Sequence, residues 1–185
     1  MIISIKEIIY FIVISLALGY IFSGLFSYRI KTVYHMMNPR RFDARDFYFA
    51  VLVAAPAIIL HELGHKFMAM GFGFSASFEV FWFGLALGVF LKLISSPFLI
   101  LAPAYVTFPI LGMSDIQYRL VAFAGPAVNL LLFLVALIML RNTEKKSRKE
   151  VAFWAFTKKL NLLLFIFNMI PFGPLDGAKV IFGLG

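Results

Sequence analysis

The sequence contains no cysteine, few histidines and few charged residues. Without cysteine the chain forms neither disulfides nor thiolate metal sites, so histidine and carboxylate side chains are the ligands left for a metal. Charged residues are 14% of the chain and hydrophobic residues 62%, whereas soluble domains average about 25% charged and about 45–50% apolar residues. This balance indicates a membrane protein, and a length of 185 residues predicts a single domain.

The positive charge is unevenly distributed along the chain. The formal net charge is +8 at pH 7, and most lysines and arginines fall in two short segments, 29–45 and 141–149, that separate apolar runs. Clusters of this kind are typical of the loops of a multi-pass membrane protein. No basic stretch is interleaved with aromatic residues as in a nucleic-acid-binding surface. We therefore expect contact with the lipid bilayer and no nucleic-acid partner.

Four apolar runs are each long enough to cross a bilayer as a helix, which takes about 20 residues. They comprise residues 8–26, 47–70, 118–140 and 151–170. The first run lacks the cleavage site of a signal peptide, so we expect a retained helix. The sequence predicts an all-α polytopic protein of the cell membrane, with about four transmembrane helices in one membrane-embedded domain over residues 1–185.

A short region between the second and third runs has a different periodicity. Residues 72–81 alternate between apolar side chains and small or polar ones, which predicts a β-strand. A lone strand in lipid would leave backbone groups unpaired, and residues 102–108 are the expected neighbour. The stretch between them, 82–94, fits either a re-entrant hairpin or a pair of short helices. We therefore expect a small membrane-associated β or re-entrant segment beside the helices.

The sequence His61-Glu62-Leu63-Gly64-His65 lies inside the second apolar run. Histidines four residues apart lie on one face of a helix, so both imidazoles can reach one metal ion. Glu62 follows the first histidine and is placed to accept a proton from a water at that metal. Two of the chain's three histidines are in this motif. Polar side chains are costly to bury in hydrocarbon, and those found there usually belong to a functional site. The motif therefore predicts a zinc site with a general base, Glu62, beside it.

Asp176 is the candidate for the third protein ligand that a catalytic zinc requires. If the second and fourth runs enter the bilayer from the same side, His61 lies roughly 21 Å deep, His65 roughly 27 Å and Asp176 roughly 24 Å, at about 1.5 Å per residue. The alternative is that Asp176 caps a short terminal helix starting at Gly177. His35 lies in a polar loop without a partner at ligand spacing, and we interpret it as a solvated histidine.

Three sequence patterns, taken together, resemble those of a known family. They are His61-Glu-Leu-Gly-His65, Gly125-Pro-x-x-Asn129, and Asn168-x-x-Pro171 continuing to Leu175-Asp176-Gly177. In order and separation they are similar to those of the site-2 proteases, which are intramembrane zinc metalloproteases. The strand-like residues after the histidine motif and the segment Ala102-Pro-Ala-Tyr-Val106 resemble a short archaeal branch of that family. The resemblance covers residues 47–180. On its own, Asn129 is better explained by packing between helices than by a role in the site.

The resemblance implies a role for each matching residue. His61, His65 and Asp176 would bind Zn²⁺, and Glu62 would be the general base that activates the attacking water. Asn168 corresponds to the family's asparagine near the metal, where it could hold the substrate backbone or stabilise the developing oxyanion.

The resemblance also implies a transmembrane protein or peptide as the substrate. A helix hides its carbonyl groups in its own hydrogen bonds, so the substrate must unwind, and the edge of the predicted strand at 74–80 could pair with the unwound segment. The loop charges and the resemblance disagree on the orientation of the protein in the membrane. Both basic loops lie opposite the site, which places the site near the outer face, whereas the family places it nearer the cytosol; we favour the family's orientation.

Two other functions fit the same zinc motif. In a membrane zinc peptidase of the prenyl-protein type, a later glutamate would be the third ligand, and Glu79, Glu144 and Glu150 are the candidates. In a non-catalytic metal-binding scaffold, or pseudoprotease, the site would hold metal without turnover.

Overall fold

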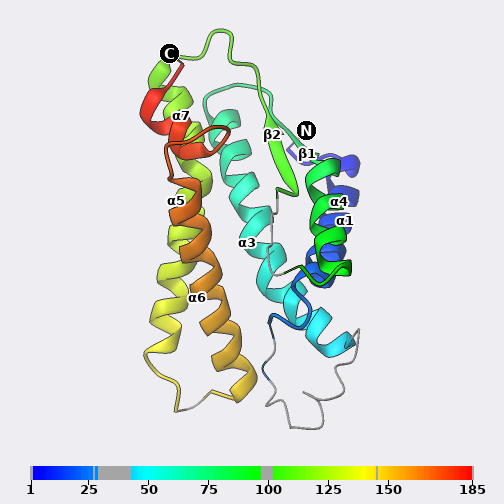
Figure 1. Cartoon of the computed structure of the whole chain (residues 1–185). Coiled ribbons are helices and arrows are strands. Elements are labelled where there is room, and N and C mark those ends of the chain that lie inside the picture. The colour runs from blue at the N-terminus through cyan, green and yellow to red at the C-terminus, as the bar shows by residue number, and fades with distance from the viewer. Residues whose placement is uncertain (1, 27, 29–42, 97–101, 145, 185) are drawn as a thin grey trace.

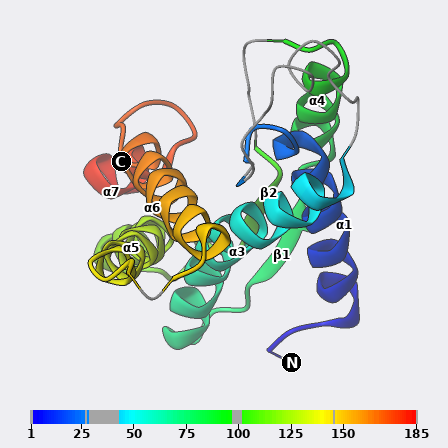
Figure 2. The same ribbon diagram turned by 90° about the horizontal axis from the view of Figure 1, so that it is seen from below.

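Helix α3 (Ala44–Gly71) runs through the middle of the fold in the computed structural model (Figure 1). Helix α1 (Ile5–Phe22) packs along one side of it and α5 (Asp115–Leu140) along the other (Figure 2). Helix α6 (Arg148–Asn168) returns beside α5, and the short helix α7 (Asp176–Phe182) also packs against α5. The structure describes residues 2–26, 28, 43–96, 102–144 and 146–184.

Helices α1, α3 and α5 are long and apolar enough to cross a membrane. The largely helical architecture predicted from the sequence is thereby confirmed, and three long apolar helices support the predicted membrane character. Helix α6 has 21 residues, but it carries Lys158 and Lys159 near its middle and is not among these three candidate spans. The fourth transmembrane helix therefore stays a prediction.

Side-chain caps define where the long helices begin. Ser114 and Gln117 form a capping box at the start of α5. Helices α1 and α6 begin in the same way, with a serine hydroxyl accepting from the third backbone N–H, at Ser4 and Ser147. Asp43 caps α3. Each cap satisfies backbone N–H groups that the helix itself leaves unpaired.

The strand pair predicted between the second and third apolar runs is present. Strand β1 (Ser77–Val80) pairs antiparallel with β2 (Ala104–Thr107). Phe78 and Val80 are buried in the core shared with α1 and α3 while their neighbours are more exposed, which is the alternation seen in the sequence. The next stretch forms one helix, α4 (Trp82–Leu93), in place of the expected hairpin or helix pair. Its 12 residues are too few to cross a bilayer.

A buried ion pair connects α1 to α3 and β1. Lys66 Nζ donates to Glu7 Oε1, and these two residues are only 2% and 3% exposed. The backbone N–H of Phe78 donates to the same oxygen at 2.7 Å, and that of Ser4 donates to Oε2 at 2.8 Å. Buried charges persist only when such partners satisfy them. Glu7 therefore fixes the start of α1 against the helix that carries the histidine motif.

Candidate metal centre

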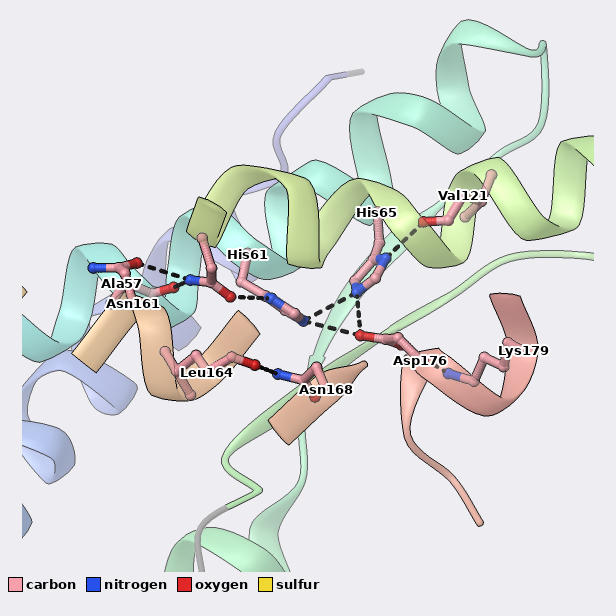
Figure 3. A network of polar contacts seen from close by, with 10 residues as sticks. Ala57, His61, His65, Val121, Asn161, Leu164, Asn168, Asp176 and Lys179 are labelled. Carbon is pink, nitrogen blue, oxygen red and sulfur yellow. Dashed lines mark hydrogen bonds and ion pairs between the residues drawn. The ribbon is translucent and has the colours of Figure 1, made fainter. Parts of the chain in front are cut away.

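His61 and His65 project from the same face of α3 (Figure 3). Their Nε2 atoms lie 3.1 Å apart, and each residue is 7% exposed. The spacing of four residues therefore does what the sequence predicted: it places both imidazoles, one turn apart, beside the same point in space.

Asp176 is the first residue of α7, and its carboxylate faces the two imidazoles (Figure 3). Its Oδ2 lies 3.2 Å from the Nε2 of each histidine, and its Oδ1 lies 3.3 Å from Lys179 Nζ. The N-cap of α7 is Leu175, so the alternative in which Asp176 caps a helix starting at Gly177 is wrong. The three side chains expected to share a depth are brought together.

Two features hold α7 in this position. Gly177 packs so closely against the end of α6 that a Cβ atom would lie 2.4 Å from a backbone carbonyl there. Arg119 of α5 donates to the carbonyl of Val180 at 2.7 Å and to that of Ile181, near the last turn of α7, where a cation is favourable. The position of Asp176 thus depends on a close backbone approach and on a cap supplied by another helix.

The second ring nitrogen of each histidine is hydrogen-bonded to an acceptor. His61 Nδ1 donates to Asn129 Oδ1 at 2.6 Å, and His65 Nδ1 donates to the carbonyl of Val121 at 2.7 Å. Because both oxygens can only accept, each Nδ1 carries the proton and each Nε2 keeps a lone pair for a metal. Partners of this kind orient metal-binding histidines. Asn129 therefore contributes to the site in addition to packing between helices.

The three side chains fit a zinc ion. Their ligand atoms all lie within 4.8 Å of one another, and the individual separations are 3.1–3.2 Å. Ligands at about 2.0–2.1 Å from a tetrahedral zinc are about 3.3–3.4 Å apart, so the observed triangle is within a few tenths of an ångström of that geometry. Two imidazoles and one carboxylate are a donor set that catalytic zinc sites use, with the fourth position open to water or substrate.

Glu62 lies beside these groups without being tied to another residue. The residue as a whole is half-buried, and within the described part of the chain its side chain makes no hydrogen bond or ion pair. It is close enough to His61, His65 and Asp176 to interact electrostatically with all three. A carboxylate that is not engaged elsewhere is free to accept a proton from a reacting group.

Asn168 is the last residue of α6 (Figure 3). One of its Nδ2 protons is donated to the carbonyl of Leu164 at 3.0 Å, four residues earlier in the same helix. The structure gives it no contact with the three candidate ligands, and its role stays a prediction. Sequence reasoning missed Asn161, two turns earlier, whose amide reaches Asn129. The available signal was an amide in an apolar helix, which needs a partner.

A comparison with known proteins shows the family. A protein of Methanocaldococcus jannaschii that bears the name "putative zinc metalloprotease" is 31% identical over 142 residues, which are 76% of this chain and 72% of that protein. The chain belongs to this zinc metalloprotease family.

Two bacterial proteins that are also named putative zinc metalloproteases match this chain over smaller shares. A protein of Synechocystis is 31% identical over 131 residues, which are 70% of this chain but 29% of its own length. YwhC of Bacillus subtilis is 34% identical over 70 residues, which are 34% of this chain and 32% of its own length. No family model and no solved structure matches the chain.

Gly125 has no side chain, and the space beside it is filled by His61 and His65. A Cβ atom on Gly125 would lie 2.3 Å from His65 Nε2 and 2.7 Å from His61 Nε2. We expect Gly125→Ala to displace the ligand atoms and weaken zinc binding, measured by competition with a chelator. Gly71→Ala is the matched control, because a Cβ atom there meets nothing within 4 Å. Equal zinc affinity in wild type and Gly125→Ala would contradict the arrangement.

Proposed function

We propose that the chain is an intramembrane zinc endopeptidase of the site-2 protease type, and that it lies in the cell membrane as a multi-pass protein. The observation that carries this proposal is the meeting of His61, His65 and Asp176 at 3.1–3.2 Å on the long apolar helix α3 and the short helix α7. A hydrolytic metal site on a helix that can span a membrane is suited to substrates that are themselves in the membrane.

The residues around the site have separate tasks in peptide hydrolysis. His61, His65 and Asp176 would hold the zinc, which when bound supplies Lewis-acid polarisation of the attacking water and of the scissile carbonyl. Glu62 takes the proton from the water and delivers it to the leaving amide nitrogen. Asn168 donates its second Nδ2 proton, which no described residue accepts, to the oxygen of the tetrahedral intermediate.

The strand pair offers an edge for an unwound substrate, but at a different strand from the one expected. The backbone N–H of Phe78, which points away from β2, is taken by Glu7, so the outer edge of β1 is already engaged. Ala104 and Val106 lie opposite Val80 and Phe78, at positions whose backbone groups point away from β1 in this alternating ladder. We therefore place pairing with a transmembrane protein or peptide substrate on β2.

Replacement of Asp176 by alanine tests the ligand assignment. We expect Asp176→Ala, purified in detergent, to lose stoichiometric zinc and to stop cleaving an unstructured test protein. Glu79→Ala is the control, because Glu79 pairs with Lys6 on the surface at 2.8 Å. Glu150, another candidate third ligand in the alternative of the prenyl-protein type, is already engaged in the cap of α6 at Ser147. Zinc retained by Asp176→Ala would instead favour a site of the prenyl-protein peptidase type, and zinc binding without any cleavage by wild type would favour a scaffold.

A further inference from the structure

Three buried polar side chains from three helices form a continuous chain that ends at the metal site. Asn161 of α6 contacts Asn129 of α5, and Asn129 contacts His61 of α3 (Figure 3). Both asparagines are 0% exposed. An amide at such a position in an apolar fold is costly unless all of its hydrogen-bonding groups are paired. These three side chains therefore form a hydrogen-bond network in which each member has a defined orientation.

Backbone carbonyls fix the orientation of both amides. The carbonyl of Thr157 accepts from Asn161 Nδ2 at 2.8 Å, so Asn161 Oδ1 points to Asn129. Asn129 Nδ2 then donates to two acceptors, the carbonyl of Ala57 at 3.0 Å and Asn161 Oδ1 at 2.9 Å. Because both of its N–H groups are used there, Asn129 can present only its oxygen to His61.

We propose that Asn161 is a positioning residue for the metal site, which it controls through Asn129. It locks the Asn129 amide in the orientation that keeps the proton on His61 Nδ1 and leaves His61 Nε2 free for zinc. His65 needs no such device, because the acceptor of its Nδ1 is a backbone carbonyl, that of Val121. This inference rests on the proposed zinc site, and it links α6, which also carries Asn168, to one of the two histidines.

Asn161→Leu tests the link in the full-length protein in detergent. The substitution leaves one N–H of Asn129 without an acceptor and removes one of the two bonds that fix its amide. We expect zinc affinity, measured by chelator competition, to fall about tenfold, the lower end of the range for partners of metal-binding histidines. Thr157→Val is the matched control one turn away: its Oγ1 is buried and has no partner among the described residues, so zinc affinity should not change.

The ring ¹⁵N spectrum of histidine-labelled protein separates this role from a general loss of structure. The chain has three histidines, so each ring can be assigned by single substitution. Asn161→Leu is expected to shift the Nδ1 signal of His61 and to leave that of His65 unchanged, with and without zinc. Unchanged His61 signals, or equal shifts of both histidines, would overturn the proposal. If wild type binds no zinc, the proposed function fails, while the spectrum of the metal-free protein still decides the link.

A second background shows whether Asn161 acts on the metal site through Asn129. In Asn129→Asp both side-chain oxygens are acceptors. Either of them can therefore accept from His61, and Asn161 is no longer needed to orient residue 129. We expect that adding Asn161→Leu to Asn129→Asp no longer changes zinc affinity or the His61 signal. An effect of Asn161→Leu as large in this background as in wild type would show that Asn161 acts on the fold and not through Asn129.

Discussion

Glu62→Gln is expected to lower the rate of peptide cleavage by about 10²–10⁴-fold, the usual contribution of a positioned general base. The glutamine side chain has nearly the same size but cannot accept the proton of the attacking water. Zinc binding should persist, because the three candidate ligands contact one another and not Glu62. The measurement is the initial rate of cleavage of an unstructured protein in detergent, with zinc content determined on the same sample.

Glu79→Gln supplies the matched control for this substitution. Glu79 lies on β1, pairs with Lys6 at 2.8 Å and is not part of the cluster of His61, His65 and Asp176, so its variant should cleave at the wild-type rate. Cleavage by both Glu62→Gln and wild type at equal rates would mean that Glu62 is not the base or that a contaminating protease acts. Loss of zinc together with loss of activity would assign Glu62 a structural role.

Lys66→Met is expected to destabilise the protein by about 3–5 kcal/mol, the cost of breaking a buried ion pair by removing one partner. Lys66 and Glu7 are 2% and 3% exposed, so the Glu7 carboxylate would be left in an apolar surrounding with only backbone N–H partners. The double variant Glu7→Gln/Lys66→Met should recover much of this loss, because no unpaired charge remains and the glutamine oxygen can still accept from Phe78.

Thermal unfolding in detergent, with wild type, both single variants and the double variant, measures the coupling between the two residues. Lys6→Met is the control, since the neighbouring Lys6–Glu79 pair is exposed on the lysine side, with 57% of that side chain accessible. Its effect should be much smaller, as for surface ion pairs in general. A double variant as unstable as Lys66→Met alone would contradict the buried-pair account.

The sequence carries enough information to place the histidine motif on a helix and to identify Asp176 as the third candidate ligand. The spacing of His61 and His65 decides that they share a helix face, and the depth argument places Asp176 near them because rise per residue in a helix is constant. The strand pair is also predictable, since alternation and the need to pair backbone groups act locally. The observed β1 is shorter than the alternating stretch, because pairing with β2 extends only over Ser77–Val80.

The contacts that support the site are not predictable in the same way. Glu7 and Lys66 are 59 residues apart in the chain, and no local pattern links the first turn of one helix to the far end of another. Asn129 and Asn161 are each recognisable as amides that need a partner in an apolar helix. Which amide meets which histidine depends on how α5 and α6 are rotated against α3, and that is decided by packing over the whole fold.

The most direct test of the central claim measures zinc content and peptide cleavage on one preparation of the detergent-purified protein. The account predicts one zinc per chain and cleavage of an unstructured test protein. Chelation should remove both, and one equivalent of zinc should restore both in wild type, whereas Glu62→Gln should regain the metal alone. Cleavage that continues at the same rate in metal-free protein, or wild type that holds one zinc per chain and cleaves neither this protein nor a transmembrane peptide, would contradict the account.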